Sequence, residues 1–483
     1  MTLVILIILP LLATGFSAIR RQARLGQAVT LASALITLIL SVSSALFVVN
    51  SPEHFLMSVP GWIALDGLSA LILILVALVY FTATLFSIGY MKFKAGSGPR
   101  RFYLNFNLFA FSMLVVPLIQ EPNIVWIAVE LTTLFSVFLV GFENTHEALE
   151  AAWKYVVLTL LGAAIALLGF LILFWAAHDA GITQYSWSSL MASGGKMSPV
   201  LLQAALVLIL LGFGAKVGLV PVHTWLPDAH SQAPTPVCAL LSGVETTTVL
   251  YVILRLLPIL RSVPGNHVNI WALVFGLISA GTAAFLLVRV RDYKRLFAFS
   301  TVEHMGIILA AAGLGGGLSA QLGTSLQLVS HAVTKSFCFY AAGAVLLIVE
   351  TREIASVRGL IKKSPVTGVA LLFGGLAIAG APPFALFLSE FSVLKAGLLE
   401  GEYVAVGLLV LFISIAFFAI MYHISRMVFG PVEEDTNPAS KGRLPVSCKV
   451  TLALAAIPII VLGVYIPSSL HTLITLAAGI IGG

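Results

Sequence analysis

The sequence predicts an all-α protein that crosses a membrane many times, and three observations carry this prediction. Of its 483 residues, 59% are hydrophobic and only 10% are charged, whereas about a quarter of the residues in soluble domains are charged. Apolar runs of about twenty residues, the length of a membrane-spanning helix, recur along the chain, and its mean hydropathy is +1.06. The runs are continuous, so they lack the alternation of a membrane β-barrel. We expect a polytopic helical bundle.

The apolar runs predict fourteen membrane-spanning helices. Arg20, Arg21 and Arg24 follow the first run instead of preceding it, so we interpret that run as a helix and not as a signal peptide. An even number of spans places both termini on one side of the membrane. The expected spans lie near residues 2–19, 27–49, 65–91, 102–119, 122–142, 151–177, 200–226, 233–258, 268–289, 293–314, 322–349, 366–397, 403–429 and 448–475.

Two of these spans carry helix breakers near their middle. Pro221 interrupts the span 200–226, and Pro382 interrupts the span 366–397. Because the two spans are five apart, they suggest two five-helix repeats, the second inverted relative to the first. The expected organisation is an N-terminal three-helix segment (1–101), a first five-helix repeat (102–258), a second five-helix repeat (268–429), and a cytoplasmic loop followed by a C-terminal helix (430–483).

The distribution of Lys and Arg predicts the orientation. Of the 26 basic residues, 20 lie in loops after odd-numbered spans, three lie in loops on the other side, and three lie within spans. Cytoplasmic loops are enriched in Lys and Arg, so both termini should face the periplasm or exterior of a bacterial or archaeal inner membrane. The net charge of +6 follows from this asymmetry and requires no nucleic-acid partner. The acidic run at 433–435 belongs to an expected cytoplasmic loop.

Nine ionisable side chains fall inside the expected spans. Each would cost about 2.5–3.5 kcal/mol at the bilayer centre if it were isolated and charged, so they must be paired, neutralised or hydrated. Ionisable residues at this depth indicate an ion pathway by default. They are Glu130, Lys216, Glu245, Glu303, His304, His331, Lys335, Glu390 and Lys395.

Glu130 and Lys216 are expected to form an ion pair that opens and closes. In the closed pair the lysine holds its proton. In the open pair an isolated ammonium in a desolvated site is unfavourable, and the proton can leave. The alternative is a static bridge that only fixes helix packing.

His331 and Lys335 share one helix face with Gln327, because residues four apart are neighbours on a helix. Such a polar stripe is typical of a hydrated relay, although a single buried histidine is often structural. Glu303 and His304 extend the candidate route, and the alternative for them is an interfacial pair near the headgroups.

Asp228 and His230 lie in the short connection after the first broken span. They predict a place where protons enter beside that span, with Lys395 as a further candidate; the alternative is a rigid turn rich in proline.

No cofactor is expected in this chain. Cys238, Cys338 and Cys448 stand apart, without the spacing of a zinc or iron–sulfur site. The glycines lack the spacing of phosphate-binding or dinucleotide-binding loops.

Four segments carry a family resemblance: GAKVGLVPVHTWLPDAHSQAPTPV, RDYKRLFAFSTVEHMGII, HAVTKSFCFYAAGAV and GAPPFALFLSEF. They resemble the antiporter-like proton-conducting subunits of respiratory complex I and its Mrp-type relatives. Among these they are most similar to the large antiporter-like membrane component of hydrogenase-4 and formate hydrogenlyase complexes. The resemblance spans roughly residues 100–430. It implies fourteen helices, two inverted repeats and a half-channel in each.

The resemblance also implies roles for individual residues. By matching motif, Glu130 is similar to the glutamate of the family's fifth helix, Lys216 to the lysine of its seventh, His331 to the histidine of its eleventh and Glu390 to the acidic group of its twelfth. The sequence departs from the pattern at the eighth helix, where Thr247 stands in place of the lysine found in several members. Glu245, two residues earlier, is the candidate substitute.

The resemblance implies a proton-translocating subunit without redox chemistry of its own. Its expected partners are other membrane-arm subunits, lipids and a peripheral hydrogenase-like module carrying nickel–iron and iron–sulfur centres. The alternatives are a Na⁺/H⁺ antiporter subunit of the multisubunit Mrp type, a subunit of an inorganic-carbon uptake complex, and a scaffold whose polar residues only fix packing.

Overall fold

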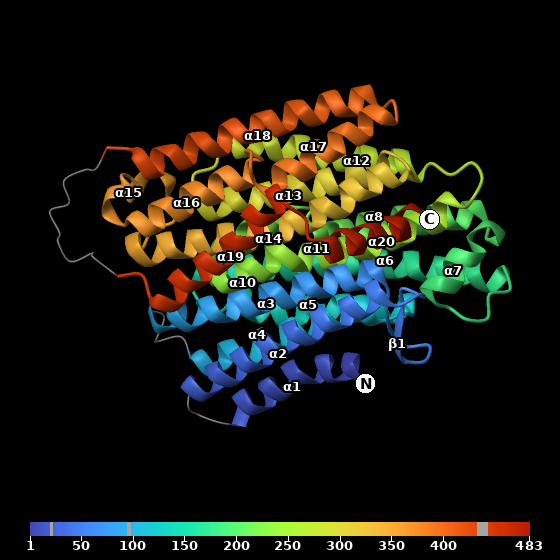
Figure 1. Cartoon of the computed structure of the whole chain (residues 1–483), viewed down its shortest axis with the longest axis horizontal. Coiled ribbons are helices and arrows are strands. Elements are labelled where there is room, and N and C mark those ends of the chain that lie inside the picture. Colours follow the sequence, from blue (N-terminus) through green and yellow to red (C-terminus); the bar gives the residue numbers. More distant parts are fainter. Residues whose placement is uncertain (20–22, 94–97, 432–442) are drawn as a thin grey trace.

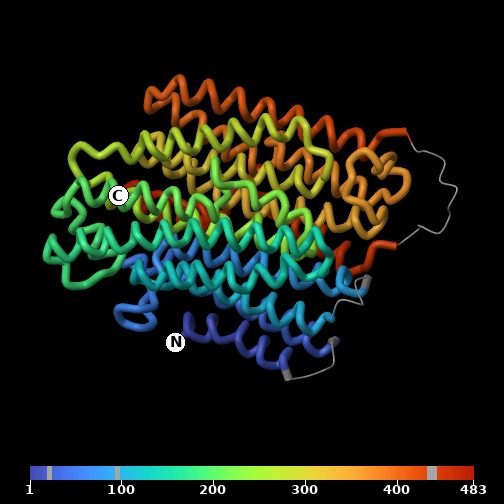
Figure 2. Tube along the Cα trace, turned by 180° about the vertical axis from the view of Figure 1, so that it is seen from behind, coloured from blue at the N-terminus to red at the C-terminus, as the bar shows by residue number. Residues whose placement is uncertain are grey.

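The computed structural model describes residues 1–19, 23–93, 98–431 and 443–483. Its helices run along the longest axis of the molecule, and both termini lie toward the same end of the bundle, opposite α15 (Leu360–Lys363) (Figures 1 and 2). The polytopic all-α fold expected from the apolar runs is confirmed.

The N-terminal part consists of three long helices and a small β-hairpin. The hairpin was not predicted from the sequence. The hairpin strands pair antiparallel with Leu56 opposite Leu65, and its turn contains Gly61 at a φ of 75°, a conformation that favours glycine. The elements are α1 (Thr2–Ile19), α2 (Ala23–Asn50), β1 (Leu56–Val59), β2 (Ile63–Leu65) and α3 (Gly67–Phe93).

The next helices surround the first broken span. The chain leaves α8 through Gly218, which adopts a left-handed conformation (φ 88°), and re-enters a helix at Trp225. The break predicted from Pro221 is therefore present. The elements are α4 (Pro99–Val115), the 3₁₀ turn η2 (Val116–Leu118), α5 (Pro122–Val140), α6 (His146–Asp179), α7 (Trp187–Ser193), the 3₁₀ turn η3 (Gly194–Lys196), α8 (Pro199–Val217) and α9 (Trp225–Gln232).

A π-helical turn interrupts the most deeply buried helix. The segment comprises α10 (Thr235–Leu240), the π turn η4 (Leu241–Glu245) and α11 (Thr246–Arg261). Within η4 the N–H of Thr246 donates to the carbonyl of Leu241, five residues earlier. Short π segments inside α-helices occur frequently at functional sites, because the extra residue re-aims the neighbouring side chains.

The C-terminal half contains the second broken span and one departure from prediction. The break between α16 and α17 matches the one predicted from Pro382. The expected single helix 448–475 is wrong, because the chain is extended at 465–467 and forms two helices there; Pro467 restricts the residue before it to extended conformations. The elements are α12 (Val268–Leu287), α13 (Tyr293–Gly313), α14 (Leu318–Val349), the 3₁₀ turn η5 (Ile354–Ser356), α15, α16 (Pro365–Ile378), α17 (Ala385–Leu399), α18 (Tyr403–Phe429), α19 (Val446–Val464) and α20 (Ser468–Gly482).

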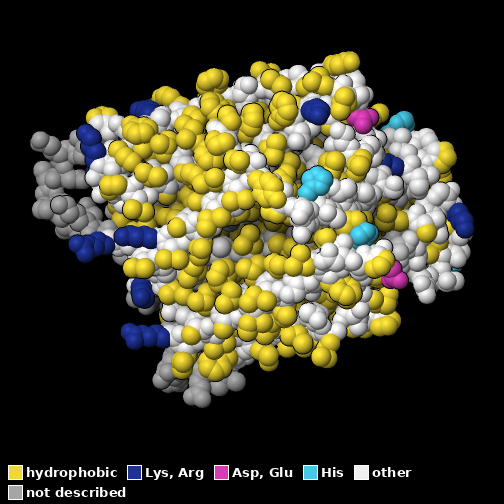
Figure 3. Space-filling model, in the orientation of Figure 1, with side chains coloured by type: hydrophobic (Ala, Val, Ile, Leu, Met, Phe, Trp, Pro, Cys, Tyr) yellow, Lys and Arg dark blue, Asp and Glu magenta, His cyan; other side chains and the backbone are white. Residues whose placement is uncertain are grey.

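In the described part of the chain, twelve helical segments are long and apolar enough to cross a membrane, and three further apolar helices are shorter. The count of fourteen spans and the inverted repeats stay predictions. On the face shown in Figure 3, Lys and Arg side chains gather at the end where α15 lies. Four basic residues of the charge count (Arg20, Arg21, Lys94 and Lys441) and the acidic run 433–435 lie outside the described residues.

Two basic residues assigned to loops are instead buried. Arg255 of α11 is 2% exposed and donates to both carboxylate oxygens of Asp66 at 2.6 Å, closing an ion pair between α11 and the start of α3. Lys294 is 1% exposed, and its ammonium donates to the carbonyls of Ser231 and Ala233. The sequence did not reveal these roles, because the partners lie 61 to 189 residues away.

Candidate functional site: a buried line of ionisable groups

Lys216 stands at the C-terminal end of α8 with its ammonium enclosed by acceptors. Its Nζ donates to the carbonyl of Val129 at 2.9 Å and to the hydroxyl of Thr133, and it lies 3.6 Å from the Oε1 atom of Glu245. An ammonium has three N–H donors and no acceptor, so the three neighbours match the protonated lysine. Lys216 and Glu245 both have side chains only 1% exposed.

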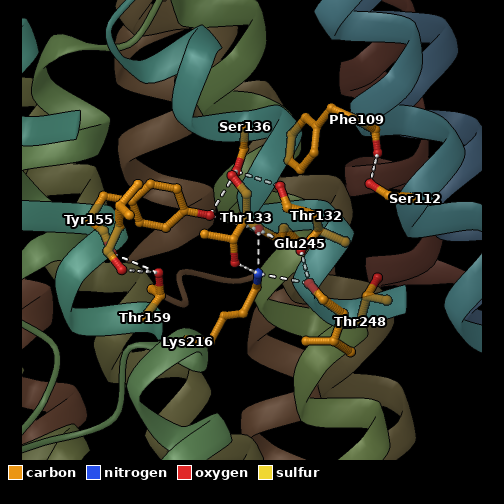
Figure 4. Close-up of polar contacts among 12 residues, drawn as sticks. Phe109, Ser112, Thr132, Thr133, Ser136, Tyr155, Thr159, Lys216, Glu245 and Thr248 are labelled. Carbon is orange, nitrogen blue, oxygen red and sulfur yellow. Dashed lines mark hydrogen bonds and ion pairs between the residues drawn. The ribbon is translucent and has the colours of Figure 1, made fainter. Parts of the chain in front are cut away.

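Glu245 closes the π turn η4, and Lys216 extends toward it from α8, beside Thr132 and Thr133 of α5 (Figure 4). Its Oε1 also accepts hydrogen bonds from the hydroxyls of Thr132 at 3.0 Å and Tyr155 at 3.1 Å. Three donors from three helices therefore converge on one carboxylate oxygen. Hydrogen bonds to an ionised group are stronger than neutral ones, so these three donors stabilise the ionised carboxylate of Glu245 against the cost of its burial.

The expected ion pair between Glu130 and Lys216 is not the one that forms. Lys216 contacts Val129 and Thr133, which are four apart and share one face of α5, whereas Glu130 points about 100° further round that helix. Among the described residues, neither carboxylate oxygen of Glu130 has a hydrogen-bond partner. In this structure the carboxylate that pairs with Lys216 is Glu245.

A second cluster lies where α13, α14 and α17 meet. His304 has its Nε2 3.3 Å from the carbonyl of Ile378, which can only accept, so Nε2 carries a proton in this bond. Its Nδ1 lies 3.4 Å from the Nε2 of Gln327 and 3.8 Å from the Oε1 of Glu390. His304 thus presents its second nitrogen to a carboxylate, an arrangement suited to exchanging a proton with it.

Lys335 repeats the pattern of Lys216 on another pair of helices. Its ammonium donates to the carbonyl of Phe297 at 2.9 Å and to the hydroxyl of Ser300, as Lys216 does to Val129 and Thr133. Both lysines therefore reach a neighbouring helix at a backbone carbonyl and a hydroxyl one turn further on.

His331 joins the two clusters. Its Nε2 lies 3.1 Å from the carbonyl of Ser242, inside the π turn, so Nε2 donates. Its Nδ1 has no partner among the described residues, and its ring centre lies 5.7 Å from that of His304. The π turn thus contributes the side chain of Glu245 to the cluster around Lys216. It also contributes the carbonyl of Ser242, which accepts the hydrogen bond from His331.

Glu303 and Glu390 differ in their surroundings. Glu303 is 2% exposed, and its Oε2 has no partner in the described part of the chain. Glu390 is 5% exposed and lines a cavity of about 300 Å³ between α17 and α18, together with the aromatic rings of Phe387 and Phe418. The line of buried groups therefore ends at a cavity.

The residues expected where protons enter do not lie in one place. Asp228 is part-buried and bridges Lys154 of α6 at 3.2 Å and Arg295 of α13 at 2.8 Å. His230 is fully buried, and burial lowers its pKa to about 3; its Nδ1 lies 2.8 Å from the carbonyl of Leu226. Lys395 is exposed on α17. Asp228 ties α9 to α6 and α13, whereas the hydrogen bond of the His230 side chain stays within α9. The role of both residues in proton uptake stays a prediction.

Several residues of the site were absent from the sequence-based set. Tyr155 and Thr132 hold Glu245, and Ser242 receives His331. A signal for Thr132 was present in the sequence, because Thr132, Thr133 and Ser136 form a polar stripe in an otherwise apolar span. Tyr155 and the carbonyl of Ser242 had no such signal.

A bundle of spanning helices with two breaks and a buried line of lysine, glutamate and histidine belongs to the class of polytopic membrane proteins with an intramembrane ion pathway. The chain belongs to the NADH:quinone oxidoreductase/Mrp antiporter transmembrane family, whose model matches residues 123–416. Residues 57–103 match a second model, the N-terminus of chain 5 of NADH-ubiquinone oxidoreductase (complex I).

The chain is 36% identical over 419 residues to the hydrogenase-4 component F homolog of Methylacidiphilum infernorum (isolate V4), covering 84% of this chain and 86% of that protein. Several longer relatives match over about half of their own length. In structure the chain is similar to a subunit of the archaeal membrane-bound sulfane sulfur reductase (TM-score 0.88, 25% identity) and to one of the Mrp complex from Dietzia sp. DQ12-45-1b (TM-score 0.85, 21% identity). Each match covers 99% of this chain and 97% of the other.

Proposed function

We propose that this chain is the proton-translocating membrane-arm subunit of an energy-converting complex related to hydrogenase-4 and complex I. The observation that carries the proposal is the line from Lys216 and Glu245 through the π turn to His331, His304 and Glu390. These groups come from elements far apart in sequence and meet inside the bundle. A scaffold would not require them, because apolar packing is as stabilising as a buried ion pair.

Proton transfer starts at the first cluster. When Lys216 leaves Glu245, the carboxylate loses its cation and can take up a proton, and Glu130, whose carboxylate has no hydrogen bond to a described residue, is the second carboxylate that Lys216 can meet. The proton then passes toward His331, whose Nδ1 is an acceptor without a partner among the described residues. We propose that water carries the proton from His331 to His304, whose ring centres lie 5.7 Å apart.

The second cluster passes the proton toward the cavity between α17 and α18. His304 accepts it at Nδ1 and faces Glu390, which opens onto the cavity between α17 and α18. Lys335 lies one turn from His331 on α14, and while it is protonated its charge disfavours a second positive charge on that imidazole. Glu303 is a further carboxylate along this part of the route.

The redox chemistry belongs to partner subunits in this proposal. A peripheral hydrogenase-like module with nickel–iron and iron–sulfur centres would drive the opening of the pair at Lys216. The name of the Methylacidiphilum relative supports this partner. We place the complex in the inner membrane of a bacterium or archaeon with both termini outside, on the strength of the basic end of the bundle (Figure 3).

The first test is gentle purification of the native complex, with identification of its subunits and assay of nickel, iron and hydrogen-linked electron transfer. Nickel, iron and a hydrogenase-like large subunit would support the proposal. The second test is Glu390→Gln in that complex. Loss of proton translocation with intact electron transfer is expected, and unchanged translocation would remove Glu390 from the route.

A Na⁺/H⁺ antiporter subunit of the Mrp type is the second candidate. The fold similarity to the Mrp complex over 99% of this chain favours it. Metal-free partners, with sodium-dependent proton flux in vesicles that lack an electron donor, would establish the antiporter and exclude the redox-driven pump.

A further inference from the structure

A cavity of about 620 Å³ opens at the basic end of the bundle, away from the line of buried ionisable groups. It lies between the α12–α13 connection, the segment after α14 and the end of α9. Its volume falls within the usual range of ligand sites, about 300–1,000 Å³. Its charged lining residues are Arg289, Arg291, Asp292, Arg295, Arg352 and Glu353.

The charges of the cavity are unbalanced toward the positive. Four arginines and two acidic residues line the cavity. Arg295 is paired with Asp228, and Asp292 is engaged as the N-cap of α13 and as the acceptor for Ser231. Arg352 donates to the carbonyl of Ser231 at 2.6 Å, which ties it to the wall. Arg289 and Arg291 are exposed, and their guanidinium groups make no hydrogen bond or ion pair with any described residue.

The wall beneath these arginines is apolar and continues onto the outside of the bundle. Leu286 and Phe299 line the cavity. On the outer face of α12, Phe285 is 58% exposed and Val288 is 51% exposed, beside Leu286. A ligand here would meet cationic groups at one end and a hydrocarbon surface at the other.

We propose that this cavity binds the phosphate headgroup of an anionic phospholipid, with Arg289 and Arg291 as the main contacts and the acyl chains along α12. Guanidinium groups bind phosphate oxygens in bidentate fashion, and basic pockets between membrane helices on the cytoplasmic side suit anionic lipid headgroups. An acidic peptide would match the arginines but not the exposed apolar strip of α12. This site is independent of the function proposed above.

A bound headgroup would stabilise the end of the bundle where α9 lies. Arg352 and Asp292 both contact Ser231 of α9 from the cavity wall. Asp228 of the same helix is bridged to α6 and α13. The lipid would therefore steady the junction of these helices beside the first broken span.

The test uses the purified full-length chain, stripped of lipid in detergent, with phosphatidylglycerol, phosphatidylcholine and inorganic phosphate as probes. Binding is measured by native mass spectrometry and by the lipid-dependent shift in melting temperature. The variant is Arg289→Gln/Arg291→Gln. The matched control is Lys92→Gln/Lys362→Gln, which removes two exposed charges from the same end of the bundle but outside the cavity.

We expect saturable binding of phosphatidylglycerol, little binding of phosphatidylcholine, and a loss of roughly 25-fold in affinity in the arginine variant, about fivefold per charge. The lysine control should change affinity less than about twofold, because its charges lie outside the cavity. Arg289→Lys/Arg291→Lys, which keeps the charge, should give an intermediate loss.

Equal affinity of the wild type and the arginine variant for phosphatidylglycerol would overturn the proposal, and so would equal binding of the two lipids. Inorganic phosphate that saturates the site and displaces the lipid at millimolar concentration would identify a free-anion site and refute the lipid assignment.

Discussion

Breaking the pair between Lys216 and Glu245 should destabilise the protein strongly when one partner is removed and weakly when both are. Both side chains are 1% exposed, with Nζ and Oε1 3.6 Å apart. The perturbations are Lys216→Met, Glu245→Gln and the double variant. In the arrangement of this structure, each single variant leaves one buried charged group without the partner that it contacts, whereas the double variant removes both groups.

The magnitude follows from the separation of the two charges. At 3.6 Å and an effective dielectric constant of about 20 their attraction is about 5 kcal/mol. Removal of one partner from a buried pair costs about 3–5 kcal/mol, and replacement of both by neutral groups is often close to neutral. We therefore expect each single variant to lose about 3–5 kcal/mol of unfolding free energy, the double variant to lie within about 2 kcal/mol of the wild type, and a coupling energy of at least about 3 kcal/mol.

The assay is titration with SDS in mixed micelles, followed by tryptophan fluorescence, on the four proteins of the cycle. Glu130→Gln is the matched control, because its carboxylate makes no hydrogen bond to any described residue. It should show less than about 1 kcal/mol of coupling to Lys216→Met. Additive single effects at Lys216 and Glu245, or stronger coupling to Glu130, would refute the assignment of Glu245 as the partner of Lys216.

Three further predictions address single positions. Tyr155→Phe should slow proton translocation about tenfold, because a hydrogen bond to a charged group is worth about 1.5–3 kcal/mol, whereas Tyr340→Phe, which removes only a bond to the hydroxyl of Thr82, should slow it less than about twofold in the same vesicle assay. His331→Gln should retain the thermal stability of the wild type within a few degrees but abolish translocation; retained translocation would exclude the imidazole from the route. Arg255→Lys should lower the melting temperature by several degrees without changing translocation per folded molecule, because lysine cannot reproduce the two contacts to the carboxylate of Asp66. A loss of translocation per folded molecule in that variant would contradict a structural role.

Local chemistry made part of the structure predictable. Pro221 and Pro382 marked the two breaks correctly, because proline removes a donor and clashes with the preceding helical turn wherever it stands. The buried positions of Lys216, His331 and Glu390 followed from apolar runs around them. The break between α19 and α20 was missed although Pro467 stood at it, because the apolar stretches on both sides of the break were interpreted as one span.

Which side chains pair between neighbouring helices could not be predicted in the same way. Whether Lys216 pairs with Glu130 or with Glu245 depends on how α5, α8 and α11 are rotated about their own axes. A sequence pattern does not give these rotations. The π turn adds one residue to its turn and shifts Glu245 relative to an ideal helix. The burial of Arg255 depended on Asp66, a residue 189 positions away.

Glu245 gives the first cluster a second carboxylate and so changes its charge balance. One ammonium now stands with two carboxylates, Glu245 beside it and Glu130 on the neighbouring helix. An unbalanced charge in a desolvated site is costly, so the cluster is neutral only when one of the two carboxylates holds a proton. Thr132 and Tyr155 donate to Glu245, whereas Glu130 has no donor among the described residues, so the proton belongs on Glu130 in this arrangement. In the proposed mechanism, movement of Lys216 from Glu245 to Glu130 would release a proton from Glu130 and allow Glu245 to take one up, so that one movement of the lysine would accompany the transfer of one proton between the two helices.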